Sequence, residues 1–196
     1  MIEDLQNKKM LDIAGCRESR PYSRSEYLGR VLWAATLPFF RFSPRSFFGW
    51  RRLLLRLFGA QIAKTAHIYP TARVYLPWKF QMGEYACVGE WALIYNLGSV
   101  KIGDRATISH RTHLCAGTHD YHDPIMPLKR LAIEVGAQAW VCADAFVGPN
   151  TRVGEGAIVG ARSVVVKDVE PWQIVAGNPA RFIKMRIMKD SLNEHD

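Results

Sequence analysis

Between residues 135 and 166 the hydrophobic positions recur every six residues, with small residues in a second register four positions later. An α-helix repeats every 3.6 residues and a strand every 2, so neither alone gives this period. A short strand followed by a turn does, and hexapeptide repeats are a signature of parallel β-helices. The aliphatic positions are Val135, Val141, Val147, Val153, Val159 and Val165, and the small residues are Ala139, Ala145, Thr151, Ala157 and Ser163.

The same period begins earlier in the chain, with two interruptions. Pro77 and Trp78 break it once, and it shifts by two within residues 95–101. Three hexads make one triangular coil of eighteen residues, so residues 61–170 predict roughly five coils of an all-β parallel β-helix. The earlier aliphatic positions are Ile62, Ile68, Val74, Met82, Val88, Ile94, Ile102, Ile108 and Leu114.

The longest break separates Leu114 from Val135, and its 21 residues are not a multiple of six. The inserted loop, residues 120–134, reads DYHDPIMPLKRLAIE and is rich in turn-forming and charged residues. A regular solenoid gains no core from such a segment, and long loops on rigid scaffolds often carry function. We therefore expect the chemistry near this insertion.

Residues 1–60 differ in character from the repeats. Residues 1–30 are polar, and we expect a weakly ordered arm or one that orders against a partner. Residues 31–59 mix aromatic, aliphatic and Arg residues and predict two short amphipathic helices. Ser43 followed by Pro44 fits a helix N-cap with Pro at the first position, and Gly59 fits a stop.

Two uses of residues 31–59 stay open and are compatible. The helices can cap the apolar end of the β-helix, or they can lay a basic, aromatic face on an anionic membrane. At the other end, Gly177-Asn178-Pro179 predicts a turn within residues 171–196, followed by a short closing helix over 181–189 and a tail.

The length of 196 residues suits one domain with an appendage, and the net charge of +8 favours an anionic partner. No DNA-recognition motif accompanies the arginines, so we expect no nucleic acid. The four cysteines show no CxxC spacing and suit reduced thiols. We find no secretory signal, and no apolar run reaches the length of about 18 residues that a membrane-spanning helix needs. These features predict a cytoplasmic protein.

Among six histidines, His119 has the most informative position. It holds the sixth slot of the hexad that starts at Leu114, which points out of the coil at the root of the insertion. An imidazole there can act as a general base near neutral pH. A zinc site is the rival use of these residues, and no GxSxG, phosphate-loop or dinucleotide motif is present. The other histidines are His67, His110, His113, His122 and His195.

Several longer runs make the chain similar to a known group of enzymes. The segments LLLRLFGAQIA, CAGTHDYHDP, AWVCADAFVGPNTRVGEGAIVGARSVVVKD and AGNPARFIK together resemble the colanic-acid-type exopolysaccharide acetyltransferases. These are hexapeptide-repeat acyltransferases and relatives of the maltose, galactoside and nodulation-factor acetyltransferases. The resemblance implies a left-handed β-helix, a homotrimer with its active site between subunits, and acetyl transfer from acetyl-CoA to a sugar hydroxyl.

The resemblance also implies site residues. His119 in THDYHDP matches the catalytic histidine, which takes the proton of the acceptor hydroxyl. Asn96 resembles an asparagine at the acceptor site, although its spacing to His119 is shorter than in the sugar acetyltransferases. Trp140 resembles a tryptophan that flanks the same site.

The remaining matches concern the co-substrate. The backbone around Ala143 would face the thioester, and Gly160 with Ala161 would line the pantetheine arm. Arg181 and Lys184 resemble the basic residues that meet the CoA phosphates. The acceptor would be a sugar or a lipid-linked saccharide, reached by a protein that also lies peripherally on the inner membrane face. We expect no metal. Two other functions stay open, a zinc enzyme like the γ-class carbonic anhydrases and a non-catalytic assembly module.

Overall fold

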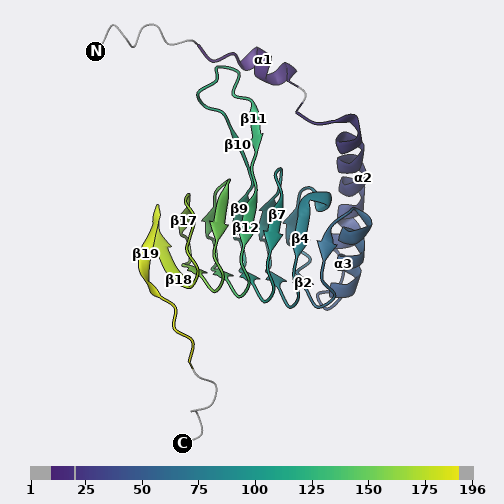
Figure 1. Ribbon diagram of the computed structural model, residues 1–196. Helices are drawn as coiled ribbons and strands as arrows, with labels where there is room; N and C mark the ends of the chain where they lie inside the picture. The colour runs from purple at the N-terminus through teal and green to yellow at the C-terminus, as the bar shows by residue number, and fades with distance from the viewer. Residues whose placement is uncertain (1–9, 20, 190–196) are drawn as a thin grey trace, which may run out of the picture.

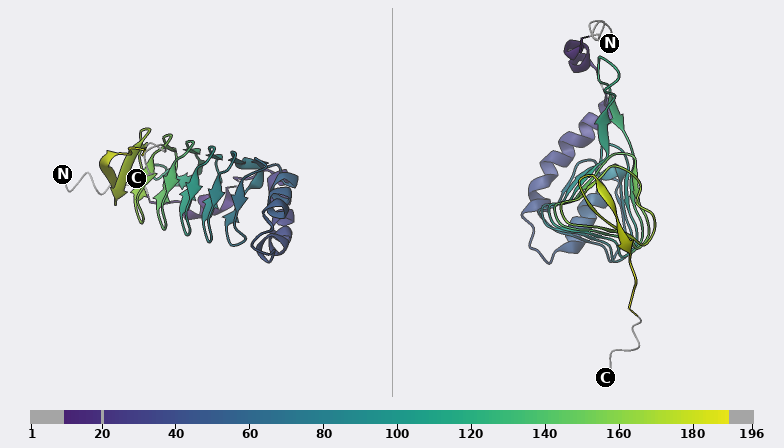
Figure 2. Two further views of the ribbon diagram at one scale, coloured as in Figure 1. Left: turned by 90° about the horizontal axis from the view of Figure 1, so that it is seen from below. Right: turned by 90° about the vertical axis from the view of Figure 1, so that its left-hand side faces the viewer.

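The computed structural model describes residues 10–19 and 21–189; the first part of the expected N-terminal arm and the end of the tail, with His195, lie outside this range. Its body is a solenoid of stacked coils with a triangular cross-section (Figure 1, Figure 2). Three parallel sheets form the three faces, and each coil contributes one short strand to each. The prediction of an all-β parallel β-helix with roughly five coils is confirmed.

The strands of each face are as follows. Sheet A contains β1 (Gln61–Ile62), β4 (Phe80–Met82), β7 (Val100–Ile102), β12 (Ile133–Val135) and β15 (Thr151–Val153). Sheet B contains β2 (His67–Ile68), β5 (Cys87–Val88), β8 (Thr107–Ile108), β13 (Trp140–Val141), β16 (Ile158–Val159), β18 (Gln173–Gly177) and β19 (Ala180–Met185). Sheet C contains β3 (Arg73–Val74), β6 (Leu93–Tyr95), β9 (His113–Cys115), β14 (Phe146–Val147) and β17 (Val164–Val165).

The period of six sets the core. All six valines between 135 and 165 are at most 2 % exposed, and the small residues of the second register are buried beside them. Each aliphatic side chain points inward from one face, so one column of the core forms along each sheet. At roughly 25 cal/mol per Å² of apolar surface, this narrow continuous core is the main stabilising term.

The early interruptions are longer corners. Ile62 pairs with Met82 and Met82 with Ile102, twenty residues apart, whereas Val135 and Val153 are eighteen apart. The two additional residues lie between sheets C and A, where a short 3-10 helix, η2 (Pro77–Lys79), turns the first coil.

At the same corner the third coil carries the insertion. It projects as an antiparallel hairpin of β10 (Gly117–His119) and β11 (Leu128–Arg130), which stands out from the solenoid in Figure 1. Two backbone bonds fix its base: Gly98 N–H and Leu131 N–H both donate to the carbonyl of Ala116, at 2.9 and 3.1 Å. A Cβ on Gly98 would lie 2.2 Å from the Leu131 oxygen, so only glycine allows this close approach.

Three helices precede the coils: α1 (Ile13–Glu18), α2 (Arg24–Arg41) and α3 (Phe48–Leu57). The expected weak arm over residues 1–30 is wrong from Ser23 onward, because Ser23 and Glu26 form a reciprocal capping box that starts α2. Helices α2 and α3 close the first coil through Trp33, Phe40 and their neighbours, and the Trp33 ring N–H donates to the carbonyl of Val74 at 2.8 Å. Residues 31–59 therefore pack on the apolar end of the first coil, which is the position expected of a cap.

The predicted N-cap at Ser43 is wrong. Helix α3 begins at Phe48, and the Ser43 hydroxyl instead accepts a bond from the guanidinium of Arg51 at 2.8 Å. Arg51 is fully buried and also donates to the carbonyls of Pro44, Arg45 and Ile68. One side chain therefore ties the α2–α3 loop to the first coil. Gly59 ends α3 with φ at +87°, as expected.

The predicted C-terminal helix over 181–189 is also wrong. Residues 180–185 form β19, which pairs antiparallel with β18 through the turn expected at Gly177-Asn178-Pro179. Strand β18 would otherwise leave its backbone N–H and C=O groups unpaired at the sheet edge, and β19 satisfies them. A strand on this edge therefore outweighs the local helix signal.

Candidate active site

The hairpin orients His119 through a backbone contact. His119 is the last residue of β10 and is exposed, and its Nδ1 lies 2.6 Å from the carbonyl oxygen of Met126. A carbonyl oxygen only accepts, so Nδ1 carries the proton and the neutral ring keeps its free lone pair on Nε2. Nε2 makes no hydrogen bond within the part of the chain that the structure describes. This is the arrangement that a general base needs.

The loop beyond His119 is fixed by its own polar groups. The carboxylate of Asp120 forms an ion pair with Lys129 across the hairpin at 2.8 Å and accepts a bond from the backbone N–H of His122. Hydrogen bonding to Lys129 is the main cause of a lowered pKa of Asp120, and the His122 N–H adds to it. Asp123 accepts from the N–H of Ile125. Met126 is therefore held where its carbonyl meets His119.

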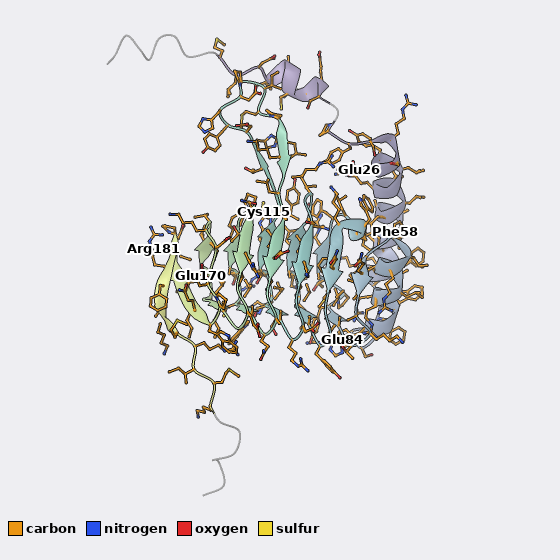
Figure 3. All side chains as sticks on the ribbon, viewed as in Figure 1. Glu26, Phe58, Glu84, Cys115, Glu170 and Arg181 are labelled. Carbon is orange, nitrogen blue, oxygen red and sulfur yellow. The ribbon has the colours of Figure 1, made fainter. Side chains whose placement is uncertain are left out.

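The hairpin is also anchored to the N-terminal helices. On β11, Arg130 forms an ion pair with Glu26 of α2 at 2.9 Å and also hydrogen-bonds the carbonyl of Pro21. At the tip, the backbone N–H of Asp12 donates to the carbonyl of Pro124 at 2.8 Å, which places α1 against the hairpin. In Figure 3, Glu26 lies on α2 level with the hairpin, and Cys115 marks the base of the hairpin.

Glu26 is the centre of this anchor. Burial alone would raise the pKa of Glu26, but the Ser23 N–H, Arg130 and Lys79 outweigh it and hold the pKa below its usual value of 4.5. Lys79 lies 3.7 Å from the same carboxylate. The base of the hairpin thus rests on an ionised carboxylate between two cations.

Sheet B carries the predicted co-substrate residues. Trp140 opens β13, is 46 % exposed and donates its ring N–H to the hydroxyl of Ser109 at 2.9 Å. Ala143 and Ala161 follow β13 and β16 at the same corner, and the Arg162 N–H donates to the Ala143 carbonyl. Gly160 directly follows β16, and a Cβ there would lie 2.9 Å from the Ala176 side chain. These positions form one track along the B–C edge of the solenoid.

The C-terminal hairpin extends this track. Arg181 pairs with Ala176 and Lys184 with Ile174, and the register shift between Ile174 and Val175 accounts for the odd spacing. Residues three apart on a regular strand face opposite ways, so the extra residue puts Arg181 and Lys184 on the same face as Ala176 and Ile174. Both are exposed, and Figure 3 shows Arg181 at the far end of the solenoid.

Asn96 does not lie at this surface. It is fully buried, its Oδ1 accepts from the N–H groups of Tyr75 and Leu76, and its Nδ2 donates to the Leu76 carbonyl. Its amide therefore closes the long corner of the second coil. This geometry does not support a role at the acceptor site.

The hairpin and the track stand apart within one chain. The hairpin leaves the corner between sheets C and A, whereas Trp140 and the track belong to sheet B and its edge with sheet C (Figure 2). Sheet C separates the two. The structure thus places the predicted co-substrate residues along sheet B and its edge, and His119 at another corner.

The zinc alternative depended on several histidines meeting. Within residues 10–19 and 21–189, no group of three His, Cys, Asp or Glu side chains lies close enough to hold a metal ion. His113, one of the histidines considered for such a site, is half buried in a row of rings with Tyr95 and Phe146. In the same described ranges, no helix has the length and apolar character needed to cross a membrane.

Sequence reasoning missed the residues that position His119. Met126 acts through its carbonyl, which no side-chain pattern reveals. The ion pair of Arg130 joins residues 104 positions apart. The capping-box spacing of Ser23 and Glu26 was the one available signal that α2 extends to this point.

A solenoid of hexapeptide coils is the fold of a class of acyltransferases, and comparison with known proteins places this chain among them. The chain is 39 % identical over 158 residues to the colanic acid biosynthesis acetyltransferase WcaF of Escherichia coli (strain K12), covering 81 % of this chain and 87 % of that protein. The galactoside O-acetyltransferase of the same organism is 28 % identical over 89 residues, 44 % of each chain. No family model matches the chain.

Solved structures share the fold. A hexapeptide-repeat acetyltransferase from Vibrio cholerae superimposes with a TM-score of 0.76 at 21 % identity, covering 83 % of this chain and 93 % of that one. A galactoside acetyltransferase in complex with coenzyme A gives 0.74 at 23 % identity, covering 83 % of each. The chain belongs to the hexapeptide-repeat acetyltransferase family and is similar to the colanic-acid-type members within it.

Proposed function

We propose that this protein transfers an acetyl group from acetyl-CoA to a sugar hydroxyl in the synthesis of a surface polysaccharide, with His119 as the general base. The observation that carries this proposal is the contact of His119 Nδ1 with the Met126 carbonyl, which leaves Nε2 free to accept a proton. Similarity to a colanic acid biosynthesis acetyltransferase supports the substrate class.

The reaction follows from that lone pair. Nε2 of His119 takes the proton of the acceptor hydroxyl while the hydroxyl oxygen attacks the thioester carbonyl carbon. The tetrahedral intermediate collapses, the carbon–sulfur bond breaks, and the imidazolium returns the proton to the leaving thiolate. The products are an acetyl ester and free CoA, and the histidine ends in its starting form. Trp140 would flank the acceptor, and backbone near Ala143 would stabilise the oxyanion.

The track on sheet B supports the CoA part of the proposal. Ala143, Gly160 and Ala161 present little side-chain bulk along one edge, which suits an extended pantetheine arm. At the end of the track, Arg181 and Lys184 offer two exposed cations on one face to the CoA phosphates.

We further propose that the working unit is a homotrimer. His119 and the track occupy different corners of one chain, so neither corner alone holds both the base and the co-substrate. A neighbouring copy that sets its hairpin against the track would complete the site. Three such contacts close a ring because each copy uses one hairpin and one track.

A second partner is the membrane surface. The outer side of α2 exposes large apolar residues, with Phe39 at 67 % and Phe42 at 83 %, and α3 adds Trp50 and Leu57. Arginines 24, 41 and 45 are exposed on the same segment. Such a basic, apolar helix face suits peripheral contact with an anionic inner-membrane leaflet and a lipid-linked saccharide as acceptor.

A thiol-release assay with acetyl-CoA across a panel of sugars tests the reaction. We expect CoA release only with an accepted sugar, and His119→Ala to lower turnover at least about a hundredfold, the usual scale for a general base. CoA binding should persist in this variant. His122→Ala, three residues away on the same loop, is the matched control and should retain activity. Full activity of His119→Ala would contradict the mechanism.

A further inference from the structure

A cavity of about 240 Å³ lies between α2 and the first coil. We call it the α2 cavity. Its floor is apolar and buried, formed by Trp33, Phe40 and Val74. Ala34, Arg41 and Arg73 also line it and are exposed, so they mark its mouth. The remaining lining residues are Arg30, Leu37, Pro70, Ala72 and Tyr75.

Three arginines surround this apolar floor, and no carboxylate lines the cavity. None of Arg30, Arg41 and Arg73 forms an ion pair in the described part of the chain. Instead, each guanidinium lies over an aromatic ring. Arg30 lies over Tyr22, and Arg73 lies over Tyr75. The third, Arg41, lies over Trp91. An aromatic face holds a guanidinium in place without neutralising its charge.

Arg30 supplies a further observation. Its Nη1 atom is buried and makes no hydrogen bond with the described residues. Leaving a charged donor without a partner is costly, and a turn of the Arg30 guanidinium toward the cavity would let an anionic oxygen accept from it. The cavity therefore combines an apolar floor with three arginines that lack a carboxylate partner in the described residues, and this combination matches an anion that carries a hydrocarbon group.

The surroundings point to the source of such a ligand. The side of α2 opposite the cavity exposes Leu28, Val31, Leu32 and Phe39, and Phe42 follows at the C-terminal end of the helix, so this helix is apolar on both sides. An apolar outer face next to a cationic mouth is suited to the boundary between headgroups and acyl chains of a bilayer. At that depth, the anion within reach is a lipid phosphate.

We propose that the α2 cavity binds the phosphate group of an anionic lipid together with the first part of its hydrocarbon chain. The phosphate oxygens would lie among Arg30, Arg41 and Arg73, and the chain would contact Trp33 and Phe40. The volume is below the roughly 300–1,000 Å³ of typical small-molecule pockets, so it suits a headgroup and not a whole CoA. This proposal deepens the membrane contact above and rests on it for the origin of the ligand.

Calorimetric titration of the full-length protein with octyl phosphate, kept monomeric, tests the site directly. We expect saturable binding that weakens at least about tenfold in Arg30→Gln and in Arg73→Gln, as for the loss of one charge-assisted bond. Ala34→Trp should block the mouth from an exposed helix position. Arg24→Gln is the matched control, because Arg24 lies on the same helix outside the cavity.

Two further probes separate the possible sources of binding. Inorganic phosphate and octanol should each bind at least about tenfold more weakly than octyl phosphate. If inorganic phosphate binds as tightly as octyl phosphate, the cavity does not recognise the hydrocarbon chain and the lipid assignment fails. If octanol binds as tightly as octyl phosphate, the cavity does not recognise the phosphate group and that part of the proposal fails. Absence of saturable binding, or equal binding by wild type, Arg30→Gln and Arg73→Gln, would overturn the site.

The outcome is separable from that of the proposed reaction and membrane contact. His119→Ala should lose acetyl transfer but bind octyl phosphate normally. Arg30→Gln should lose octyl phosphate binding but acetylate a soluble sugar at the wild-type rate. A variant that loses the outer apolar face, Phe39→Asp with Phe42→Asp, should still bind soluble octyl phosphate even where it no longer binds vesicles.

Discussion

His119 Nδ1 and the Met126 carbonyl oxygen are 2.6 Å apart across the hairpin. The two residues are seven apart in sequence, and the turn between them is stabilised by the ion pair of Asp120 and Lys129. The hairpin thus presents one nitrogen of the imidazole to solvent and uses the other to fix the ring. The orientation of the proposed base depends on how firmly this short loop is held.

Loosening that loop should lower the rate without removing the base. In Lys129→Met, we expect the turnover number to fall about tenfold while the KM for acetyl-CoA stays near the wild-type value, because misplacement of a reacting group costs rate. Steady-state kinetics measures both. Lys129→Arg keeps the cation and should restore most of the rate. A KM effect with unchanged turnover would instead assign Lys129 to binding.

The anchor of Arg130 on Glu26 should fail in acid. Because the pKa of Glu26 in the folded protein is below 4.5, its contribution to stability is fully present above about pH 4.5 and is lost as the pH falls through the lowered value. We expect the thermal midpoint of the wild type to fall more steeply below about pH 4.5 than that of Glu26→Gln. Parallel curves would show that Glu26 is not held ionised by the fold.

His113 should make the protein sensitive to pH in a higher range. Burial lowers the pKa of His113 from 6.5, and its Nε2 is buried without a partner in the described residues. Below 6.5 the unfolded chain binds a proton that the folded chain does not, so stability falls with pH until the lowered pKa is reached. His113→Phe, between Tyr95 and Phe146, should remove this loss in thermal unfolding.

The exposed His110 provides the control for that measurement. His110→Gln replaces an exposed histidine outside the row of rings and controls for the effect of a histidine substitution as such. If His113→Phe follows the wild-type curve throughout, the buried ring does not titrate with folding.

If the site lies between subunits, two inactive variants should complement each other. His119→Ala removes the base, and Ala161→Trp obstructs the track at an exposed position. In trimers reassembled from equal amounts of both, about a quarter of the interfaces combine an intact hairpin with an intact track. We expect about that fraction of wild-type activity. No recovery after verified subunit exchange would place the whole site in one chain.

The core could be predicted from sequence because its signal is local. The valines from Val135 to Val165 that recur every six residues are the ones that point into the core. The length of the repeat also sets which residues of successive coils stack on one another. The breaks in the period correctly marked the long corners and the hairpin. The conformation of the irregular segments depends on partners that are distant in sequence. The side chain of Asn96 binds the backbone of Leu76, and residues 180–185 pair with the edge strand β18.

The site could be predicted only in part for the same reason. The sequence singles out His119 because it ends the last regular hexad before the insertion, and its role as general base stays a prediction. The resemblance placed Asn96 at the acceptor, but the additional corner residues carry its amide inward. The contacts of Met126, Glu26 and Arg130 arise from pairing across the fold and leave no trace in local spacing.

The apolar outer face of α2 leads to the last prediction. Phe39 and Phe42 are largely exposed and outside the core, so Phe39→Asp with Phe42→Asp should preserve folding and thermal stability. We expect the wild type to float with vesicles that contain phosphatidylglycerol and the double variant to remain in the soluble fraction, because aspartates oppose both burial and anionic lipid. Deletion of residues 1–59 is a poorer test, since it removes Trp33 and Phe40 from the core. If these helices only cap the β-helix, the wild type should remain in the soluble fraction as well. If the wild type still floats in high salt, the contact depends more on the apolar residues than on the arginines, because salt screens charge.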